Sequence, residues 1–261
     1  MTAITLWGAT ASPYQLKMQA LADAAGVAWR RAPEQVSTVQ AMAMALRLRR
    51  AQRTESIERL PQREAGLDEY PAVPFYTLDG KTFYYDSTGL AYHLQQLTPG
   101  AKGLLPDEPA ERFACQLIDE AFDEFGLYMA HHNRWVTSAA TNTMGEMTAR
   151  ELRRLIPPFL RKTVARRMAE RQVRRCPYLF SVAPQGFDCA MPAALTPPAR
   201  AGFPPTHTLL DTAWRQYLAA MEEILAKQPY LLGEGFTLAD ASAYGQLAMN
   251  LVDGRAAQLL E

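Results

Sequence analysis

Cysteine is scarce in this chain of 261 residues, which contains only Cys115, Cys176 and Cys189 and no CxxC pair. An odd number of cysteines without that spacing argues against a disulfide scaffold and against a zinc site. Few cysteines of this kind are also typical of a reducing compartment. We therefore expect a cytoplasmic protein that holds no metal ion.

The chain also lacks long apolar runs and an excess of either charge. No stretch approaches the ~18 apolar residues that span a bilayer, and the first residues do not resemble a signal peptide. Lysine plus arginine number 27, and aspartate plus glutamate also number 27. This balance gives the whole molecule no attraction to nucleic acid or to an anionic membrane. We expect neither as a partner, and any such binding would have to be local.

Strand and helix signals alternate through the first hundred residues. A β-prone run at 4–7 is followed by a loop and by Pro13, a residue type preferred at the first position of a helix. Apolar residues then recur at helical spacing until Gly26, which suits a helix end. A second strand is expected near 27–30. One or two helices are expected over 40–62, where strong helix formers are concentrated.

A hairpin is the clearest local signal. Residues 73–78 and 81–85 are β-prone and flank an Asp-Gly pair at 79–80, which favours a tight turn. Residues 86–88 then supply N-cap side chains for a helix that ends before Pro99. The predicted order is therefore β-α-β-α-β-β-α.

Beyond this point the sequence predicts only helices. Proline and glycine cluster at 99–108, which indicates a linker. Helical periodicity follows at 110–137, 148–175 and 209–227. Residues 176–205 are too rich in proline and glycine for a helix, so we expect a long ordered loop there.

Four short segments carry a resemblance to a known family. They are Ser12-Pro13-Tyr14 at a predicted helix start, Val73-Pro74 before the hairpin, Asp86-Ser87 at the next helix start, and Gly-Phe-Thr-Leu-Ala-Asp at 235–240. Together, and in this order, they resemble the soluble glutathione transferase family over nearly the whole chain. The resemblance implies a thioredoxin-like α/β domain over 1–98, a linker over 99–108 and an all-helical domain over 109–261.

The resemblance also implies a function. Glutathione would be the cosubstrate, and a serine-type enzyme would transfer its thiolate to an apolar electrophile between the two domains, as in detoxification. A homodimer and the absence of a metal are implied as well. Glutathione-dependent ether cleavage or dehalogenation is a narrower form of this hypothesis. The alternative is a non-catalytic protein of the same fold that acts as a binding or scaffold module, since fold does not determine function.

Ser12 is our candidate catalytic residue, because the family places the residue that activates the thiol here. A helix that begins at Pro13 presents free N–H groups and the positive end of its dipole, and both favour a thiolate. A hydroxyl donor would add to this. Thr10 and Tyr14 are the reserve candidates, and a plain helix N-cap is the structural alternative for Ser12. A serine in place of a cysteine disfavours thiol exchange and leaves addition or substitution.

Four residues are candidate contacts to glutathione. The resemblance implies that Val73 bonds the peptide through its backbone and that Pro74 is cis. Asp86 and Ser87 would hold the γ-glutamyl end, since a carboxylate pairs with an ammonium group and a helix start accepts a carboxylate. Ordinary N-capping is the alternative for both. In the segment 235–240 we expect a capping box formed by Thr237 and Asp240, with a role in folding.

Candidates for the electrophile pocket are aromatic. Tyr128, His132 and Trp135 are spaced to share one helical face, and Tyr14 lies beside Ser12. The alternative is an aromatic stripe packed in the core. The adjacent pair His131 and His132 does not predict a metal site, because neighbouring helical residues point about 100° apart.

Two basic features have no assigned role. Residues 150–175 contain ten arginines or lysines and two glutamates, which fits an anionic partner or, as we favour, a solvated helical face. The segment 40–69 is longer than the family pattern, and no residue in it aligns with the contact to the glycine carboxylate of glutathione. Arginines of that segment are partners for a carboxylate by chemistry alone: Arg47, Arg49, Arg50 and Arg53.

Overall fold

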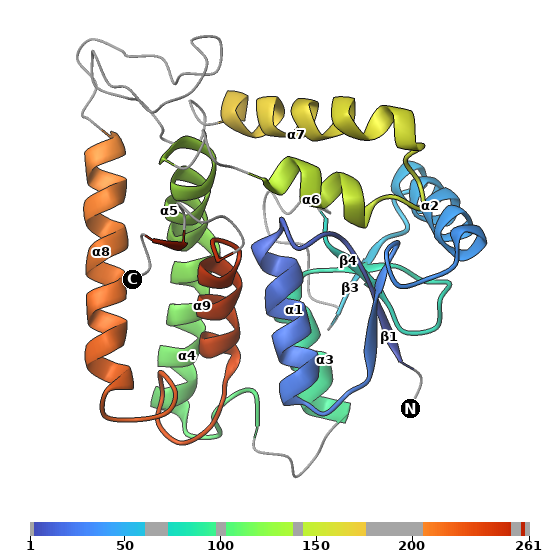
Figure 1. The fold of residues 1–261 in the computed structure, drawn as a ribbon. Helices are drawn as coiled ribbons and strands as arrows, with labels where there is room; N and C mark the ends of the chain where they lie inside the picture. Colours follow the sequence, from blue (N-terminus) through green and yellow to red (C-terminus); the bar gives the residue numbers. More distant parts are fainter. Residues whose placement is uncertain are drawn as a thin grey trace.

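The computed structural model describes residues 3–60, 73–97, 103–137, 143–175, 206–251 and 257–258. A five-stranded sheet with helices on both faces forms the first part, and helices form the rest (Figure 1). The elements of the first part are β1 (Ile4–Trp7), α1 (Pro13–Ala24), β2 (Trp29–Ala32), α2 (Thr38–Arg53), β3 (Glu58–Arg59), β4 (Phe75–Thr77), β5 (Tyr84–Tyr85) and α3 (Ser87–Leu97).

The sheet is mixed, with strand order β2-β1-β4-β5-β3. β1 pairs in parallel with β2 and antiparallel with β4, and β4 pairs antiparallel with β5. Neighbouring residues of β4 serve opposite faces: Phe75 packs in the cluster beneath α2, and Tyr76 packs in the larger cluster with α1 and α3. The alternation of the strands therefore builds two layers of core around one sheet.

The predicted order of elements holds with one addition. The helix expected over 40–62 ends at Arg53, and after a turn in which Glu55 has a φ of +51° the chain forms β3, which pairs with β5. A two-residue strand has too little periodicity to be recognised in the sequence. β2 begins at Trp29, two residues later than expected.

The second part consists of helices in its described residues. They are α4 (Pro109–Ala121), the π-helical turn η1 (Phe122–Gly126), α5 (Leu127–His132), the π-helical turn η2 (Asn133–Thr137), α6 (Met144–Glu151), the 3-10 turn η4 (Pro158–Leu160), α7 (Arg161–Arg175), α8 (Thr206–Leu225) and α9 (Leu238–Ala248). The predicted fold class, a thioredoxin-like domain followed by a helical one, is confirmed.

One helix prediction was wrong. The basic stretch 148–175 is not a single helix, since α6 ends at Glu151 and α7 begins at Arg161. Pro157 and Pro158 lie between them, and proline interrupts the hydrogen bonds of a helix. The predicted loop 176–205 lies outside the described residues, as do 98–102, so the domain boundary stays a prediction.

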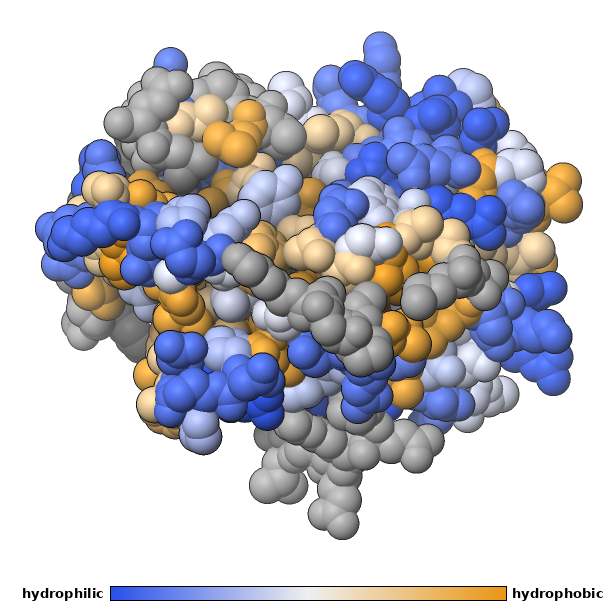
Figure 2. All heavy atoms as spheres, turned by 90° about the horizontal axis from the view of Figure 1, so that it is seen from below, coloured by the Kyte–Doolittle hydropathy of each residue, from blue (hydrophilic) through white to orange (hydrophobic). Residues whose placement is uncertain are grey.

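The two parts meet where α9 lies against α1. An added Cβ at Gly245 of α9 would lie 2.5 Å from the Pro13 carbonyl oxygen, so only glycine allows this approach. Core residues of both parts join one hydrophobic cluster, Leu21 from α1 and Leu238 from α9 among them. Seen from the end opposite α7, hydrophobic side chains gather between hydrophilic margins (Figure 2).

The predicted capping box at the start of α9 is formed, and it makes a stability prediction. The Asp240 carboxylate accepts hydrogen bonds from the Thr237 amide and hydroxyl, each 2.8 Å, and from the Leu231 amide at 2.8 Å. Asp240→Ala leaves these buried donors unpaired, so we expect it to lower the free energy of unfolding by about 3 kcal/mol in urea denaturation. Asp211→Ala on α8 removes an exposed ion pair and should change it by less than about 0.5 kcal/mol. Equal effects of both substitutions would contradict the prediction.

Candidate active site

A cleft of about 630 Å³ opens between α1, α3 and α4. This volume is within the ordinary range of ligand sites, ~300–1,000 Å³. Five of the residues predicted for the site line it: Tyr14, Val73, Pro74, Asp86 and Ser87. The Val73–Pro74 peptide bond is cis, as the resemblance implied. Segments that are far apart in the sequence thus converge on one cavity.

Asp86 has a defined orientation at the start of α3. Its backbone φ is +77°, a region that side chains rarely adopt, and its Oδ1 accepts a hydrogen bond from the Thr88 amide at 2.9 Å. Its Oδ2 accepts one from Arg59 Nε at 2.5 Å. Arg59 also lines the cleft, and it was not predicted because it lies in β3, a strand too short to be recognised in the sequence. Asp86 therefore presents a carboxylate whose charge is shared with a cation of the same cleft.

The hydroxyl of Ser12 is free within the described chain. Ser12 precedes α1 with extended backbone, φ −97° and ψ 123°, and its side chain does not cap the helix. The N-cap alternative for this hydroxyl is therefore not realised. Ser12 is half-buried and is not among the residues that line the cleft, whereas its neighbour Tyr14 is.

The hydroxyl groups of the two reserve candidates, Thr10 and Tyr14, already donate hydrogen bonds within the protein. Thr10 donates from its hydroxyl to Glu151 Oε1 at 2.5 Å and from its amide to Glu151 Oε2 at 3.0 Å. Tyr14 donates to the Asp123 carbonyl oxygen at 2.8 Å. Burial and nearby carboxylates, Asp123 first, raise the pKa of Tyr14 well above its usual value. The Thr10 and Tyr14 hydroxyls therefore have protein partners, whereas the Ser12 hydroxyl could donate to a ligand.

The aromatic candidates on the helical part do not line the cleft. His132 and Trp135 are buried, and Tyr128 is half-buried. Trp135 packs with Met144 against Ala11, the residue before Ser12. Its ring lies 6.4 Å from that of His131, four residues earlier. Trp135 thus supports the loop that carries Ser12, and α6 fixes the same loop through Glu151.

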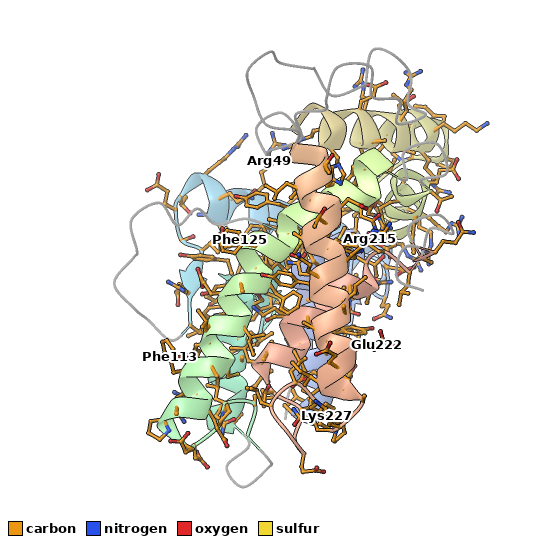
Figure 3. All side chains as sticks on the ribbon, turned by 90° about the vertical axis from the view of Figure 1, so that its left-hand side faces the viewer. Arg49, Phe113, Phe125, Arg215, Glu222 and Lys227 are labelled. Carbon is orange, nitrogen blue, oxygen red and sulfur yellow. The ribbon has the colours of Figure 1, made fainter. Side chains whose placement is uncertain are left out.

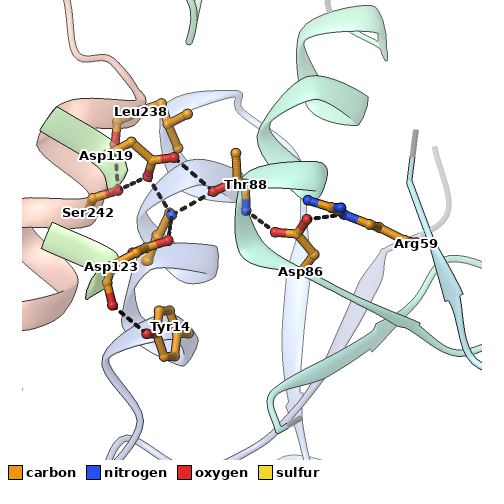
Figure 4. Close-up of polar contacts among 9 residues, drawn as sticks. Tyr14, Arg59, Asp86, Thr88, Asp119, Asp123, Leu238 and Ser242 are labelled. Carbon is orange, nitrogen blue, oxygen red and sulfur yellow. Dashed lines mark hydrogen bonds and ion pairs between the residues drawn. The ribbon is translucent and has the colours of Figure 1, made fainter. Parts of the chain in front are cut away.

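A fully buried lysine, Lys17, holds together several side chains that line the cleft, and Figure 4 shows its partners Thr88, Asp119 and Asp123. The Lys17 ammonium group of α1 lies 2.6 Å from Asp119 Oδ1 of α4 and 2.6 Å from Asp123 Oδ2 of η1. It also lies 3.0 Å from Thr88 Oγ1 of α3. Thr88 in turn donates to Asp119 Oδ2 at 2.9 Å, and Ser242 of α9 donates to Asp119 Oδ1. Four helices from both parts of the molecule thus meet at one charge.

The single positive charge of Lys17 faces the two carboxylates of Asp119 and Asp123. The excess negative charge favours the binding of a proton by one of these carboxylates. Burial raises the pKa of Asp123 to about 7 against the opposing attraction of Lys17, with the Asp119 and Asp86 charges adding to the rise. The carboxylates hold the pKa of Lys17 above its usual value although its burial acts to lower it. Asp123 lines the cleft, so its charge near neutral pH depends on this balance.

The arginines proposed for the glycine carboxylate do not line the cleft. Arg47 donates to the Gly80 carbonyl oxygen at 2.9 Å, and Arg49, Arg50 and Arg53 are exposed on α2. In the described part of the chain, Arg59 is the arginine that lines the cleft. Among the described residues, no group of three or more histidine, cysteine or carboxylate side chains is arranged to hold a metal ion. None of the described helices is long and apolar enough to cross a membrane.

Similarity to known proteins is clearest in the helical part. Residues 198–249 match the family model "Glutathione S-transferase, C-terminal domain". The matched segment contains α8 and α9 and with them the Thr237–Asp240 capping box. No curated protein matches the chain in sequence.

Solved structures of a β-etherase and of glutathione S-transferases resemble the chain at low identity. The β-etherase LigF from Sphingobium sp. strain SYK-6 is 19% identical with a TM-score of 0.48, over 95% of this chain and 83% of that one. The theta class glutathione S-transferase from Xanthomonas axonopodis pv. citri, solved with glutathione bound, is 17% identical with a TM-score of 0.44, over 93% and 78%. A glutathione S-transferase from Sinorhizobium meliloti 1021 is 12% identical with a TM-score of 0.46, over 95% and 78%.

The raised pKa of Asp123, beside Lys17 and Asp119, predicts that the stability of the protein depends on pH. The pKa of Asp123 is about 7 in the folded chain, against about 3.9 in an unfolded chain, so the folded state binds the extra proton between these values. Stability from this group therefore falls as the pH rises from about 4 to about 7. Relative to Asp123→Asn, the wild type should lose roughly 4 kcal/mol of unfolding free energy over that window, about 1.4 kcal/mol for each of about three pH units.

The measurement is urea denaturation of both proteins at a series of pH values. Glu222→Gln, an exposed carboxylate on α8, is the matched control and should follow the wild type at every pH (Figure 3). A constant difference between the wild type and Asp123→Asn would show that Asp123 titrates at its ordinary pKa.

Proposed function

We propose that the chain is a glutathione-dependent transferase that joins the glutathione sulfur to an electrophilic carbon. The observation that carries the proposal is the convergence of Val73, Pro74, Asp86 and Ser87 on one cleft beside the start of α1. The sequence alone predicts that these four residues contact glutathione. The family match at 198–249 supports the same proposal from the other part of the chain.

Glutathione would bind as an extended peptide across the ends of the sheet. The backbone of Val73, beside the cis bond, offers an N–H and a carbonyl group to the cysteinyl residue, as the edge of a sheet does. The γ-glutamyl carboxylate would lie at the N-terminus of α3, near the Ser87 hydroxyl, and its ammonium group near Asp86. Arg59 would orient Asp86 in this arrangement, because its guanidinium group donates to the Asp86 carboxylate.

The chemistry would take place at the start of α1. The thiol gives its proton to solvent, and the thiolate is stabilised by the Ser12 hydroxyl and by the positive end of the helix dipole. The sulfur then donates an electron pair to carbon. In substitution the leaving group departs with the electrons of the broken bond. In addition the displaced π electrons take a proton from solvent.

The second substrate would be an apolar electrophile that enters beside the thiolate. Tyr14 and Met18 line the part of the cleft nearest α1, and Tyr92 lines the part formed by α3. Exclusion of water by such side chains and alignment of sulfur with carbon would supply the remaining acceleration. The homodimer and a detoxification role stay predictions of the same hypothesis.

Ser12→Ala tests the proposed thiolate donor. Loss of one preorganised hydroxyl should lower kcat/KM by about 100-fold with a nitroaryl chloride as electrophile, and leave the Kd for glutathione within about twofold. The pKa of the bound thiol, followed by the ultraviolet absorbance of the thiolate, should rise. Ser12→Thr should restore part of the activity, and the exposed control Ser56→Ala should behave as the wild type. Unchanged kinetics in Ser12→Ala would remove Ser12 from the mechanism.

Ser87→Ala tests the proposed γ-glutamyl site. Removal of a buried hydroxyl that faces a ligand carboxylate should weaken glutathione binding about tenfold in calorimetric titration, with thermal stability nearly unchanged. Thr82→Ala, at the nearby hairpin turn outside the cleft, is the control. An unchanged Kd would leave Ser87 as a structural residue of α3. Absence of glutathione binding to the wild type would overturn the proposed function and favour the scaffold alternative.

A further inference from the structure

The outward face of α2 carries an unusual row of side chains. Val39, Met42 and Leu46 are 78%, 54% and 67% exposed. At 100° per residue these three positions and the arginines that follow fall within an arc of roughly 100°, opposite the buried side of the helix. The arginines of the row are exposed as well: Arg49, Arg50 and Arg53. α2 contains no acidic residue, so the row is apolar in its first half and basic in its second.

A second exposed segment has the same two kinds of side chain. Phe159 of the turn η4 is 80% exposed, and α7 begins two residues later. The exposed residues along α7 are mostly basic: Lys162, Arg166, Arg167 and Arg171. Glu170 lies 3.7 Å from Arg166 and offsets one of these charges.

The connection that leads into α7 contacts the region around α2. Leu155, between α6 and α7, packs against the hydrophobic cluster beneath α2, and Arg153 pairs with Glu34, before α2, at 3.1 Å. Figure 1 shows α7 beginning next to α2 and running away from it along one edge of the molecule. We call the row on α2, Phe159 and the basic residues of α7 the α2–α7 edge. The described cleft uses none of these side chains.

We propose that the α2–α7 edge docks the protein on an anionic lipid bilayer. Arginine and lysine side chains are complementary to anionic headgroups, and large apolar side chains beside them can enter the boundary of the acyl chains. A nucleic acid would pair with the arginines but would give Val39, Leu46 and Phe159 no apolar environment. The neutral total charge of the chain is compatible with this docking, because the positive charge is concentrated on one edge.

Vesicle sedimentation with the full chain tests the proposal. The wild type should bind phosphatidylcholine vesicles that contain about 30% phosphatidylserine and should bind pure phosphatidylcholine vesicles far more weakly. Raising the salt from roughly 0.1 M to 0.5 M should release it, because screening shortens the reach of the charges. Binding that is absent, or equal on neutral vesicles, would overturn the proposal.

Two sets of variants separate the contributions of charge and apolar insertion. Replacement of Arg166, Arg167 and Arg171 by glutamine should lower the partition coefficient on the order of 100-fold. Leu46→Ser with Phe159→Ser should lower it about tenfold. These residues are exposed, so a thermal melt like that of the wild type verifies the fold.

Matched controls lie on the helices away from this edge. Arg215→Gln with Lys227→Gln removes exposed positive charge at α8 and just beyond it, and Phe113→Ser removes an exposed aromatic ring on α4 (Figure 3). They should bind vesicles as the wild type does. Equal losses in the controls, or binding to duplex DNA without binding to vesicles, would overturn the proposal. Glutathione affinity should be unchanged in the edge variants, so this test and that of the proposed function fail separately.

Discussion

A single buried ammonium group joins the two parts of this molecule. Lys17 extends from α1 to the carboxylates of Asp119 on α4 and Asp123 on η1, at 2.6 Å each, and reaches α3 through Thr88. Removal of one partner from such a group leaves an uncompensated charge in the interior, which typically costs about 3–5 kcal/mol. The placement of α1 against the helical part therefore depends on this contact. The loop and first turn that carry Ser12 are placed with it.

The same contact gives the candidate site its electrostatic character. The Lys17 cation neutralises one of two carboxylates, and Asp123 faces both the ammonium group and the cleft. A proton or a positively charged ligand group at this wall would complete the balance of charge. On the opposite wall, Asp86 is paired with Arg59. The cleft thus has two different carboxylates in its walls. The charge of Asp86 is compensated by Arg59, whereas the protonation of Asp123 depends on the ligand group beside it.

The sequence predicted those features that depend on neighbouring residues. The proline at the start of α1, the Asp-Gly turn between β4 and β5 and the capping box of α9 act within a few positions of the chain, and all three were recognised. Arg59 and the partners of Lys17 were not, because their roles come from residues 27 to 106 positions away. Lysine in an amphipathic helix has no local pattern that indicates burial. Glu151, which binds Thr10 across 141 positions, was missed for the same reason.

Charge separation connects the cleft with the α2–α7 edge. The chain has equal numbers of acidic and basic residues, yet Asp119, Glu120, Asp123 and Glu124 lie together at the cleft, whereas exposed arginines and lysines lie along α7. Such a separation of charge gives the molecule a dipole moment although its total charge is zero, and an electric field can therefore orient it. Near an anionic surface the basic edge would turn toward the surface and the acidic cleft away from it.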